Sequence, residues 1–398
     1  MPGPGGREAH ILRRVLRRLA DAGLVLAVVT TSVLGVRPPA APRASRLALI
    51  GTYTGPASRG IYAFRFDDRT GALTPIGLAA ETPNPSFLTA SADGRFVYAV
   101  NETEDFGGDK SGSVTAFSVD EGTGRLTRLN VQSTHGAAPC HLTLDRTGKF
   151  LAVANYTGGN FVVFPVKPDG SLGPSASSLT NPGSGPNRAR QDGPHAHDVV
   201  FDRTNAFLLG VDLGLDKVHI YNFVAATGAV TPHAPAFATV PPGSGPRHLA
   251  WHPDGRRLFV INELLSTIAS FTWAPGIGAL SPVASVSTLP AGWTGENSTA
   301  EIAVHPNGRF VYGSNRGHDS VAIFSIGADS RLTPIGHEAT RGRTPRNFTI
   351  DPTGRWLVAG NQDTNTLAVF AIDAVTGKLT PTGPLADVGA PVSILFMR

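Results

Sequence analysis

The feature that most constrains the fold is a hairpin pattern that recurs with one internal spacing. Pro85 is followed by Asn101 sixteen positions later, and the same step recurs, with its end residues kept or substituted, as Pro139 to Asn155, Ala196 to Asp212, Pro246 to Asn262, Thr299 to Asn315 and Pro345 to Asn361. Each step holds two short apolar runs around a turn such as Pro-Asn-Gly at 306–308, which is typical of a β-hairpin. The copies begin 46 to 57 residues apart, a period expected for propeller blades of four short strands.

The remainder of each repeat predicts two more strands. Third strands are expected at Val114–Val119, Phe161–Val166, Val218–Phe223, Thr267–Trp273, Val321–Ile326 and Leu367–Ile372. A turn of the form D-x-x-T-G-x-L-T, as at 67–75, leads into a fourth strand. A seventh copy begins at Pro391, and its pairing with Leu47–Tyr53 would close the ring and remove exposed sheet edges. Residues 47–398 are therefore predicted to form an all-β, seven-bladed propeller of four-stranded antiparallel blades.

Residues 1–46 differ in composition from the rest of the chain. They hold eight Arg against two acidic residues, a local charge of +6, so residues 47–398 carry about −2 of the total of +4. The basic balance therefore gives no reason to expect a nucleic-acid partner. Leu24–Val36 is apolar but shorter than the roughly 20 residues of a membrane span, so no stable span is expected. The leader predicts an export signal and a periplasmic or extracellular protein; the alternatives are a disordered extension or a mis-set start codon, with a cytoplasmic location.

The repeat also predicts where chemistry gathers. In each hairpin the start of the inner strand lies beside the end of the second strand, so both face one mouth of the central channel, and the turn faces the other. Ionisable and amide side chains crowd the open ends, whereas the turns carry ordinary turn residues. The candidate site residues are His141, His195, His197, Arg247, His248, Glu263, Glu301, Arg316, His318, Arg346 and Gln362.

Several of these residues also have plainer interpretations. Arg247 and Glu263 would serve equally as an ion pair that braces one blade, and His141 as a hydrogen-bonded core residue. His195 and His197 lie on one side of a strand, but no third ligand has a matching spacing, so no metal is expected.

Other side chains are expected to play no part in the site. Successive strand side chains point to opposite faces, so Cys140 and His141 are not expected to form a thiol–imidazole pair. His252 and His305 are expected to be turn or surface residues. Trp251, Trp273 and Trp356 are expected to pack between blades. The sequence contains no motif for a cofactor, and none is expected.

Paired motifs from successive repeats carry a family resemblance. They are PCH (139–141) with ANYTGG (154–159), PHAH (194–197) with VDLGLD (211–216), GPRH (245–248) with INEL (261–264), AEI (300–302) with SNRGHDS (314–320), and TPRNF (344–348) with GNQD (360–363). With these motifs residues 47–398 resemble the seven-bladed propeller lactonases, which are related to bacterial 6-phosphogluconolactonase and fungal carboxy-muconate lactonising enzymes. Thr204-Asn205 departs from the Pro-x-Gly turn of that pattern.

The resemblance implies a catalytic set of His197, Arg247, Glu263 and Arg316, with the other candidates binding substrate. Its implied function is a lactone hydrolase of carbohydrate metabolism that acts on a small anionic or sugar-derived lactone. The protein is expected to be a monomer. Either Glu263 or His197 would activate water, while Arg247 and Arg316 would offset the developing negative charge. The alternatives are a cyclase of the muconate type and a non-catalytic, extracytoplasmic binding propeller with YVTN-like repeats, which FVYAVNE (96–102) and FVYGSNR (310–316) resemble.

Overall fold

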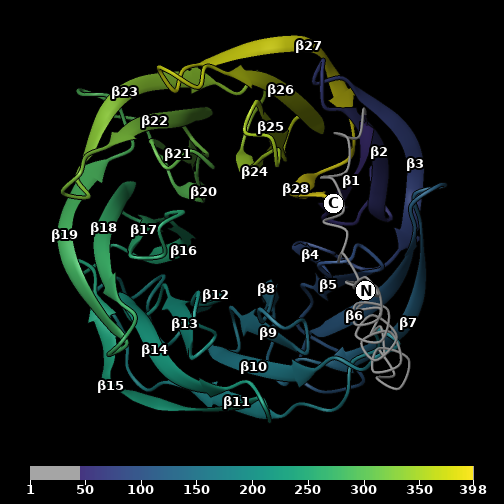
Figure 1. The fold of residues 1–398 in the computed structure, drawn as a ribbon, viewed down its shortest axis with the longest axis vertical. Helices are drawn as coiled ribbons and strands as arrows, with labels where there is room; N and C mark the ends of the chain where they lie inside the picture. Colours follow the sequence, from purple (N-terminus) through teal and green to yellow (C-terminus); the bar gives the residue numbers. More distant parts are fainter. Residues whose placement is uncertain (1–44, 398) are drawn as a thin grey trace, which may run out of the picture. The chain divides into compact units, whose positions relative to one another are not determined.

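Seven four-stranded antiparallel sheets make up residues 45–397, the part of the chain that the computed structural model describes. The predicted leader lies outside the described residues and stays a prediction. No α-helix occurs between residues 45 and 397, and therefore none long and apolar enough to cross a membrane. The sheets follow one another around a central opening as the blades of a propeller (Figure 1). The predicted fold is confirmed.

The blades are numbered here from the one that joins the two ends of the propeller. Blade 1 contains β28 (Pro391–Phe396), β1 (Ser45–Thr52), β2 (Gly60–Asp67) and β3 (Leu73–Glu81); blade 2 contains β4 (Leu88–Ala90), β5 (Phe96–Asn101), β6 (Ser113–Asp120) and β7 (Arg125–Ser133). Blade 3 contains β8 (Pro139–Leu144), β9 (Phe150–Asn155), β10 (Asn160–Pro165) and β11 (Ser177–Thr180); blade 4 contains β12 (Ala196–Phe201), β13 (Phe207–Asp212), β14 (Lys217–Val224) and β15 (Ala229–Thr239). Blade 5 contains β16 (Pro246–Trp251), β17 (Arg257–Asn262), β18 (Thr267–Ala274) and β19 (Ala279–Ser287); blade 6 contains β20 (Thr299–Val304), β21 (Phe310–Asn315), β22 (Ser320–Ile326) and β23 (Leu332–Ala339). Blade 7 contains β24 (Pro345–Ile350), β25 (Trp356–Asn361), β26 (Thr366–Ile372) and β27 (Leu379–Asp387).

Blade 1 closes the ring with strands from both ends of the propeller. β28 pairs antiparallel with β1, with Ile50 opposite Ile394 and Ala48 opposite Phe396 (Figure 1). This is the predicted pairing, although β1 begins at Ser45, two residues before the expected Leu47. The pairing covers the inner edge of β1 and gives blade 1 the same four strands as the other blades, which removes a site for edge-to-edge association.

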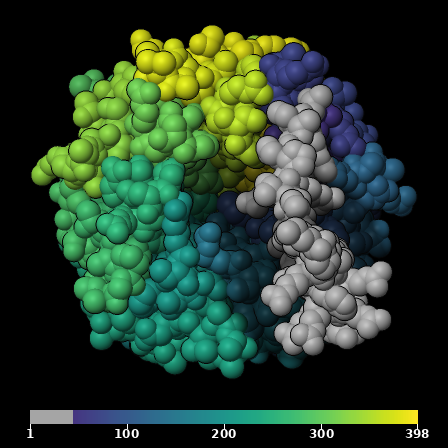
Figure 2. Space-filling model, in the orientation of Figure 1, coloured from purple at the N-terminus to yellow at the C-terminus, as the bar shows by residue number. Residues whose placement is uncertain are grey.

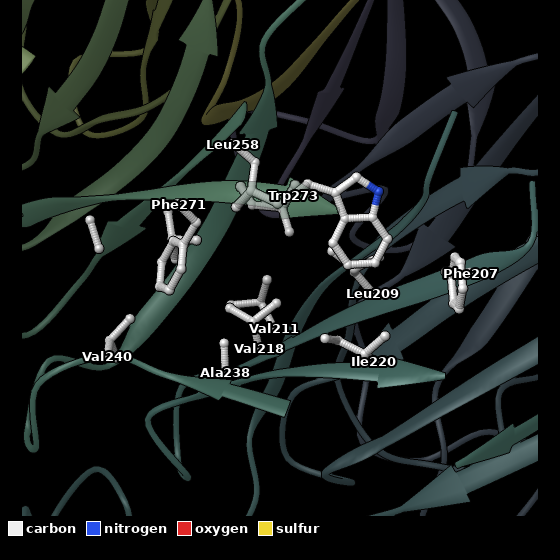
Figure 3. Packing of buried hydrophobic residues seen from close by; sticks show 13 residues of the cluster. Phe207, Leu209, Val211, Val218, Ile220, Ala238, Val240, Leu258, Phe271 and Trp273 are labelled. Atoms are coloured by element: carbon white, nitrogen blue, oxygen red, sulfur yellow. The ribbon is translucent and has the colours of Figure 1, made fainter. Parts of the chain in front are cut away.

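The hydrophobic core is divided into seven clusters, one in each interface between neighbouring blades. In the interface of blades 4 and 5, Leu209, Val211 and Ile220 pack against Leu258 and Phe271 (Figure 3). Burying one such side chain contributes about 1.5–3 kcal/mol, so each interface adds a large share of the stability. The tryptophans lie where predicted, with Trp251 and Trp273 in this interface and Trp356 between blades 7 and 1.

In blades 2 to 7 the turn between the first two strands has one residue in the left-handed region. Gly308 has φ 72° and Gly255 has φ 67°, which glycine adopts without strain. In blade 4 the same place is held by Asn205, with φ 61°, and asparagine tolerates this conformation better than most residues. The Asn205 side chain also bonds to blade 3, because its Nδ2 donates to Asp145 Oδ2 at 2.8 Å and its Oδ1 accepts from Arg146 N at 3.0 Å.

Two histidines predicted as turn or surface residues begin the turns as expected, but they are buried links between blades, so the surface alternative was wrong. His252 Nε2 lies 2.8 Å from Gly308 O in the next blade, and His305 Nε2 lies 2.7 Å from Gly354 O. The error arose because each turn packs against the turn of the following blade, an arrangement that a local turn pattern does not reveal. Both imidazoles donate to a carbonyl that the next glycine turn leaves free.

In blades 3, 6 and 7 the asparagine that ends the sixteen-residue step fastens the second strand to the loop that enters the blade. Nδ2 of Asn155, Asn315 and Asn361 donates at 2.9 Å to the carbonyl of Thr134, Thr288 and Thr340, respectively. All three asparagines are fully buried, where an unpaired amide would be costly. The sixteen-residue spacing therefore reflects a structural requirement. It also determines that the residue after each asparagine lies at the channel mouth.

Candidate active site

The inner strands are bulged at their first residues, which changes what reaches the channel. In blade 5 Pro246 pairs with Asn262 and His248 pairs with Ile261, so Arg247 is left without a partner residue. The same skip occurs at Cys140, His197 and Arg346. A bulge re-aims a side chain that regular alternation would turn away.

Because of the bulges, two successive side chains of one strand line a single cavity. Its wall includes both Arg247 and His248, and both Arg346 and Asn347. Strict alternation of side chains, which was expected at Cys140 and His141, is therefore wrong for this part of the strands. The two residues still do not pair with each other, because the Cys140 sulfur contacts His197. In the space-filling view the ring is hollowed where the blades meet (Figure 2).

An ion cluster of one carboxylate and three guanidinium groups lies at the channel mouth. Arg247 Nε is 3.1 Å from Glu263 Oε2, and Arg316 Nη2 is 2.9 Å from the same oxygen. Arg190 Nη2 donates to Glu263 Oε1 at 2.7 Å and to the Tyr156 hydroxyl at 3.1 Å. These residues come from β16, from the turns after β9, β17 and β21, and from the loop before β12. The hairpin spacing thus brings three of the four predicted catalytic residues into one cluster.

Electrostatics keep this cluster ionised. Burial favours the neutral acid, but Arg316, Arg247 and Arg190 outweigh it and lower the pKa of Glu263 to about 2. Burial lowers the pKa of Arg316 to about 10, so its guanidinium also stays charged at neutral pH. Arg316 keeps one buried donor, Nε, without a partner among residues 45–397. A fixed carboxylate with three fixed cations leaves an excess of positive charge at the mouth.

A second group lies next to the ion cluster and involves His248. Arg247 Nη1 lies 3.2 Å from His248 Nε2, and since arginine can only donate, the imidazole proton is on Nδ1. Nδ1 then donates to Glu301 Oε1 at 3.1 Å, and Asn347 Nδ2 donates to Glu301 Oε2 at 2.6 Å. Burial lowers the pKa of His248 well below its usual range and raises the pKa of Glu301 to about 7. His248 is thus held neutral in one tautomer.

His197 extends this group of imidazoles. Its Nδ1 lies 3.6 Å from Cys140 Sγ, and its ring meets the edges of Tyr156 and His248 at 5.3 Å between centroids. Burial, with Arg247 close by, lowers the pKa of His197 well below its usual range. Burial also raises the pKa of the Cys140 thiol well above its usual range, so sulfur is not a nucleophile at neutral pH. His197 is therefore a neutral imidazole at neutral pH.

His141 is tied to the neighbouring blade. Its Nδ1 lies 3.0 Å from Asp198 Oδ1, and its ring lies 4.2 Å from Phe87 and 5.3 Å from His248. Asp198 Oδ2 in turn accepts from the backbone N–H of Leu249 at 2.7 Å. These contacts suit the core role considered for His141, and its ring also packs against His248, which lines the cavity.

Arg346 is the cation that lacks a counter-ion. It lines the cavity beside Glu102, and its guanidinium lies 5.2 Å from the centre of the Tyr53 ring. Among residues 45–397 it has no hydrogen bond or ion pair from its side chain, whereas both Glu102 oxygens accept from the Tyr53 hydroxyl at 2.9 and 3.0 Å. Burial disfavours the charged form, but Tyr53, Glu102 and Glu263 outweigh it and raise the pKa of Arg346. All five of its donors are available to a ligand.

The other predicted residues lie farther from the ion cluster. His195 stacks on Tyr156 at 4.7 Å and bonds to Asp192, so it lies at the rim. Gln362 follows Asn361 as Glu263 follows Asn262, but no contact of the described residues joins it to the cluster, and its buried Oε1 has no partner among them.

His318 is not brought to the cluster. Its ring packs against Trp293 at 4.6 Å and His337 at 5.4 Å, and its Nδ1 lies 2.6 Å from Ser320 Oγ. The reason is the turn after β21, which sends Arg316 inward and then carries the chain outward toward β22.

Sequence reasoning missed three residues that shape the site, namely Tyr53, Arg190 and Asp198. Tyr53 follows Thr52 at the end of β1 just as Glu263 follows Asn262, so the same count would have found it. Asp198 follows the bulged residue His197, and regular alternation would have turned its side chain away from the site. Arg190 lies in an interblade loop outside the repeat, and no spacing points to it. Residues 45–397 contain no group of three or more His, Cys, Asp or Glu positioned to hold a metal ion.

Fold and site together define a seven-bladed propeller with an ionised, partly buried pocket at one channel mouth. Residues 47–396 match the family model described as "Lactonase, 7-bladed beta-propeller", and the chain belongs to that family. It is 36% identical over 354 residues to the 6-phosphogluconolactonase of Bacillus subtilis (strain 168), covering 88% of this chain and 98% of the relative.

Two further relatives extend the comparison. The 6-phosphogluconolactonase of Formosa agariphila is 35% identical over 337 residues, covering 83% of this chain and 93% of the relative. The structure of the periplasmic gluconolactonase of Pseudomonas aeruginosa superposes with a TM-score of 0.83 at 33% identity, covering 89% of this chain and 99% of that one. The predicted family is confirmed.

Proposed function

We propose that this protein is a lactonase that opens a sugar-type lactone by attack of water at the channel mouth. Membership of the lactonase family and relatives named as phosphogluconolactonases and a gluconolactonase support the reaction class. The observation that carries the site assignment is Arg346, a partly buried arginine that lines the cavity without an ion pair among the described residues. A cation held in this way is suited to negative charge that appears only when a ligand reacts.

Ring opening needs stabilisation of the oxyanion that forms on the lactone carbonyl. In the proposal Arg346 and Arg247 donate to this oxygen as water adds to the carbonyl carbon. Preorganised donors of this kind contribute about 10²–10³ in rate each, because they need no reorganisation during the reaction. Arg316, with its unpartnered Nε, would bind a substituent of the ring, and Gln362 Oε1 would accept from a sugar hydroxyl.

His197 is the better candidate for the base that activates water. Both oxygens of Glu263 are occupied by three arginines, so it acts as the fixed counter-ion that positions them. His197 is neutral at neutral pH and can accept a proton on Nε2, with Nδ1 facing Cys140. The proton taken from water would then pass to the ring oxygen as the carbon–oxygen bond breaks, leaving a hydroxy acid.

The test is hydrolysis of a lactone panel by the full-length protein, with spontaneous hydrolysis in buffer subtracted. The panel holds glucono-1,5-lactone, its 6-phosphate and a muconolactone. We expect turnover of at least one sugar lactone, and we expect His197→Gln to lower kcat by about 10²–10⁴, the range for loss of a general base.

Each other result has a meaning of its own. Turnover of muconolactone alone favours the cyclase alternative, and rates equal to buffer for all three favour the binding propeller. A His197→Gln variant as active as wild type contradicts the role of this base and leaves the reaction class standing.

A further inference from the structure

The loop before β12 brings a residue from outside the repeat into the site. It runs from the end of β11 at Thr180 to the start of β12 at Ala196, whereas the connection from β23 to β24 runs only from Ala339 to Pro345. From it Arg190 reaches across blade 4 to Glu263 in blade 5. Arg190 and the three residues Arg247, Glu263 and Arg316 thus form one ion cluster, although only the last three belong to the repeat.

The loop is held in one conformation by the residue next to Arg190. Gln191 is fully buried, and its Nε2 donates to Leu213 O and to Asp216 Oδ1, each at 2.9 Å. Asp216 also accepts from Gly243 N and Gly245 N, directly before the strand that carries Arg247. One carboxylate therefore fixes the approach to both arginines, so Arg190 is positioned by the fold and is not a free surface side chain.

The exposure and bonding of Arg190 differ from those of its two neighbours. Its side chain is 41% exposed, against 4% for Arg247 and 13% for Arg316. Both of its hydrogen bonds come from Nη2, and among residues 45–397 Nη1 and Nε make none. It therefore lies at the outer edge of the cluster with two donors still available, which is where the end of a ligand remote from the buried cavity would lie.

Charge balance indicates what that end carries. Within the ion cluster the three guanidinium groups of Arg190, Arg247 and Arg316 face one carboxylate, that of Glu263, which leaves a formal excess of two positive charges. A phosphate monoester carries about −1.5 to −2 at pH 7, which matches this excess, whereas an unsubstituted sugar lactone leaves it unmatched. Arginine recognises phosphate through forked donors, and Arg190 retains two.

We infer that Arg190 determines specificity by binding an anionic group, of the phosphate class, at the end of the lactone that is remote from its carbonyl. This inference rests on the proposed function and deepens it. Arg190 takes no part in the chemical step, because Arg247 and Arg316 still bind Glu263 when Arg190 is replaced. Its loss therefore weakens binding of the phosphorylated lactone and affects the reaction of the unphosphorylated lactone far less.

The experiment compares Arg190→Met, Arg190→Lys and wild type on 6-phosphogluconolactone and glucono-1,5-lactone. We expect Arg190→Met to raise KM for the phosphorylated lactone by about 10- to 100-fold, the effect of one charge-assisted hydrogen bond, with kcat changed less than about threefold. We expect the ratio of kcat/KM for the phosphorylated lactone to kcat/KM for the unphosphorylated lactone to fall by about 10-fold or more. Arg190→Lys should recover part of this loss, because it keeps the charge and loses the fork. Arg188→Met, in the same loop, is the matched control and should behave as wild type.

Two outcomes overturn the inference: an equal loss on both lactones, which would place Arg190 in the chemical step, and no loss on either. Calorimetric binding of 6-phosphogluconate and gluconate separates this inference from the proposed function. If wild type hydrolyses neither lactone, the function fails. The inference still stands if 6-phosphogluconate binds more tightly than gluconate and Arg190→Met abolishes the difference, and it falls if the two products bind equally.

Discussion

Replacement of Glu301 by Gln probes the buried electrostatics most sharply. The Glu301 carboxyl is 8% exposed, and burial raises its pKa from an ordinary value of 4.5 to about 7. A carboxyl whose pKa is higher in the folded state destabilises the fold as it ionises. Its contribution is most favourable below pH 4.5, declines as pH rises toward 7, and is constant above that. Between pH 5 and pH 8 the folded wild type should lose about 2.5 kcal/mol through this group, at 1.36 kcal/mol per pKa unit.

The glutamine of the Glu301→Gln variant does not titrate, so the variant avoids this loss. It also bears a fixed cost of about 1–3 kcal/mol, because its amide nitrogen faces the Asn347 amide that now donates to Glu301 Oε2. The informative quantity is therefore how the difference in unfolding free energy between variant and wild type changes with pH, and not its value at a single pH. We expect the free energy of unfolding of Glu301→Gln, measured in urea by tryptophan fluorescence, to improve relative to wild type by about 2.5 kcal/mol from pH 5 to pH 8.

The matched control is Glu81→Gln, which removes one negative charge from a side chain that is 62% exposed. The unfolding free energy of Glu81→Gln should differ from that of wild type by only about 0–1 kcal/mol at each pH, the range for a surface ion pair. A difference between Glu301→Gln and wild type that varies by less than about 0.5 kcal/mol across this range would refute the assignment of a raised pKa to Glu301.

Three further predictions follow from named contacts. Arg346→Met should lower kcat/KM by about 10²–10³ and change the melting temperature little, because no ion pair is broken; a large loss of stability with full activity in the remaining folded protein would contradict it. Asn205→Ala should lower the free energy of unfolding in urea by about 1–3 kcal/mol, because alanine at φ 61° is strained and the hydrogen bonds to blade 3 are lost. Asn205→Gly should lower it less, and equal losses for the two variants would exclude the backbone contribution. Removal of residues 391–398 takes β28 from blade 1 and Ile394 and Phe396 from the interface with blade 7, so the cooperative thermal transition should be lost; an unchanged transition would show that ring closure is not needed.

The sequence predicted the ring because the information is repeated within it. In five blades the sixteen-residue step ends on a buried asparagine at the open end of the hairpin, and the same step places Glu263 beside Arg247 and Arg316. The pairing of β28 with β1 followed from the incomplete copy at Pro391. Seven blades and one crowded mouth were thus predictable from periodicity and strand geometry.

What the sequence did not predict depends on contacts between repeats. The bulges that turn Arg247 and His248 toward one cavity break the alternation on which strand arguments depend. The links from His252 and His305 to the next blade, and the approach of Arg190 from an irregular loop, involve residues far apart in sequence. The catalytic roles of His197, Arg247, Glu263 and Arg316 remain predictions that kinetics must test.

The most direct measurement is kcat/KM for the best sugar lactone with Arg247→Met and Glu263→Gln, each confirmed as folded by circular dichroism. Arg257→Met is the matched control, since it removes an arginine paired with Asp254 at 2.7 Å at the turn end of the same blade. We expect kcat/KM of both site variants to be at least about 100-fold below that of wild type, and kcat/KM of the control to stay within about threefold of wild type. Site variants that also stay within about threefold would contradict catalysis at this mouth.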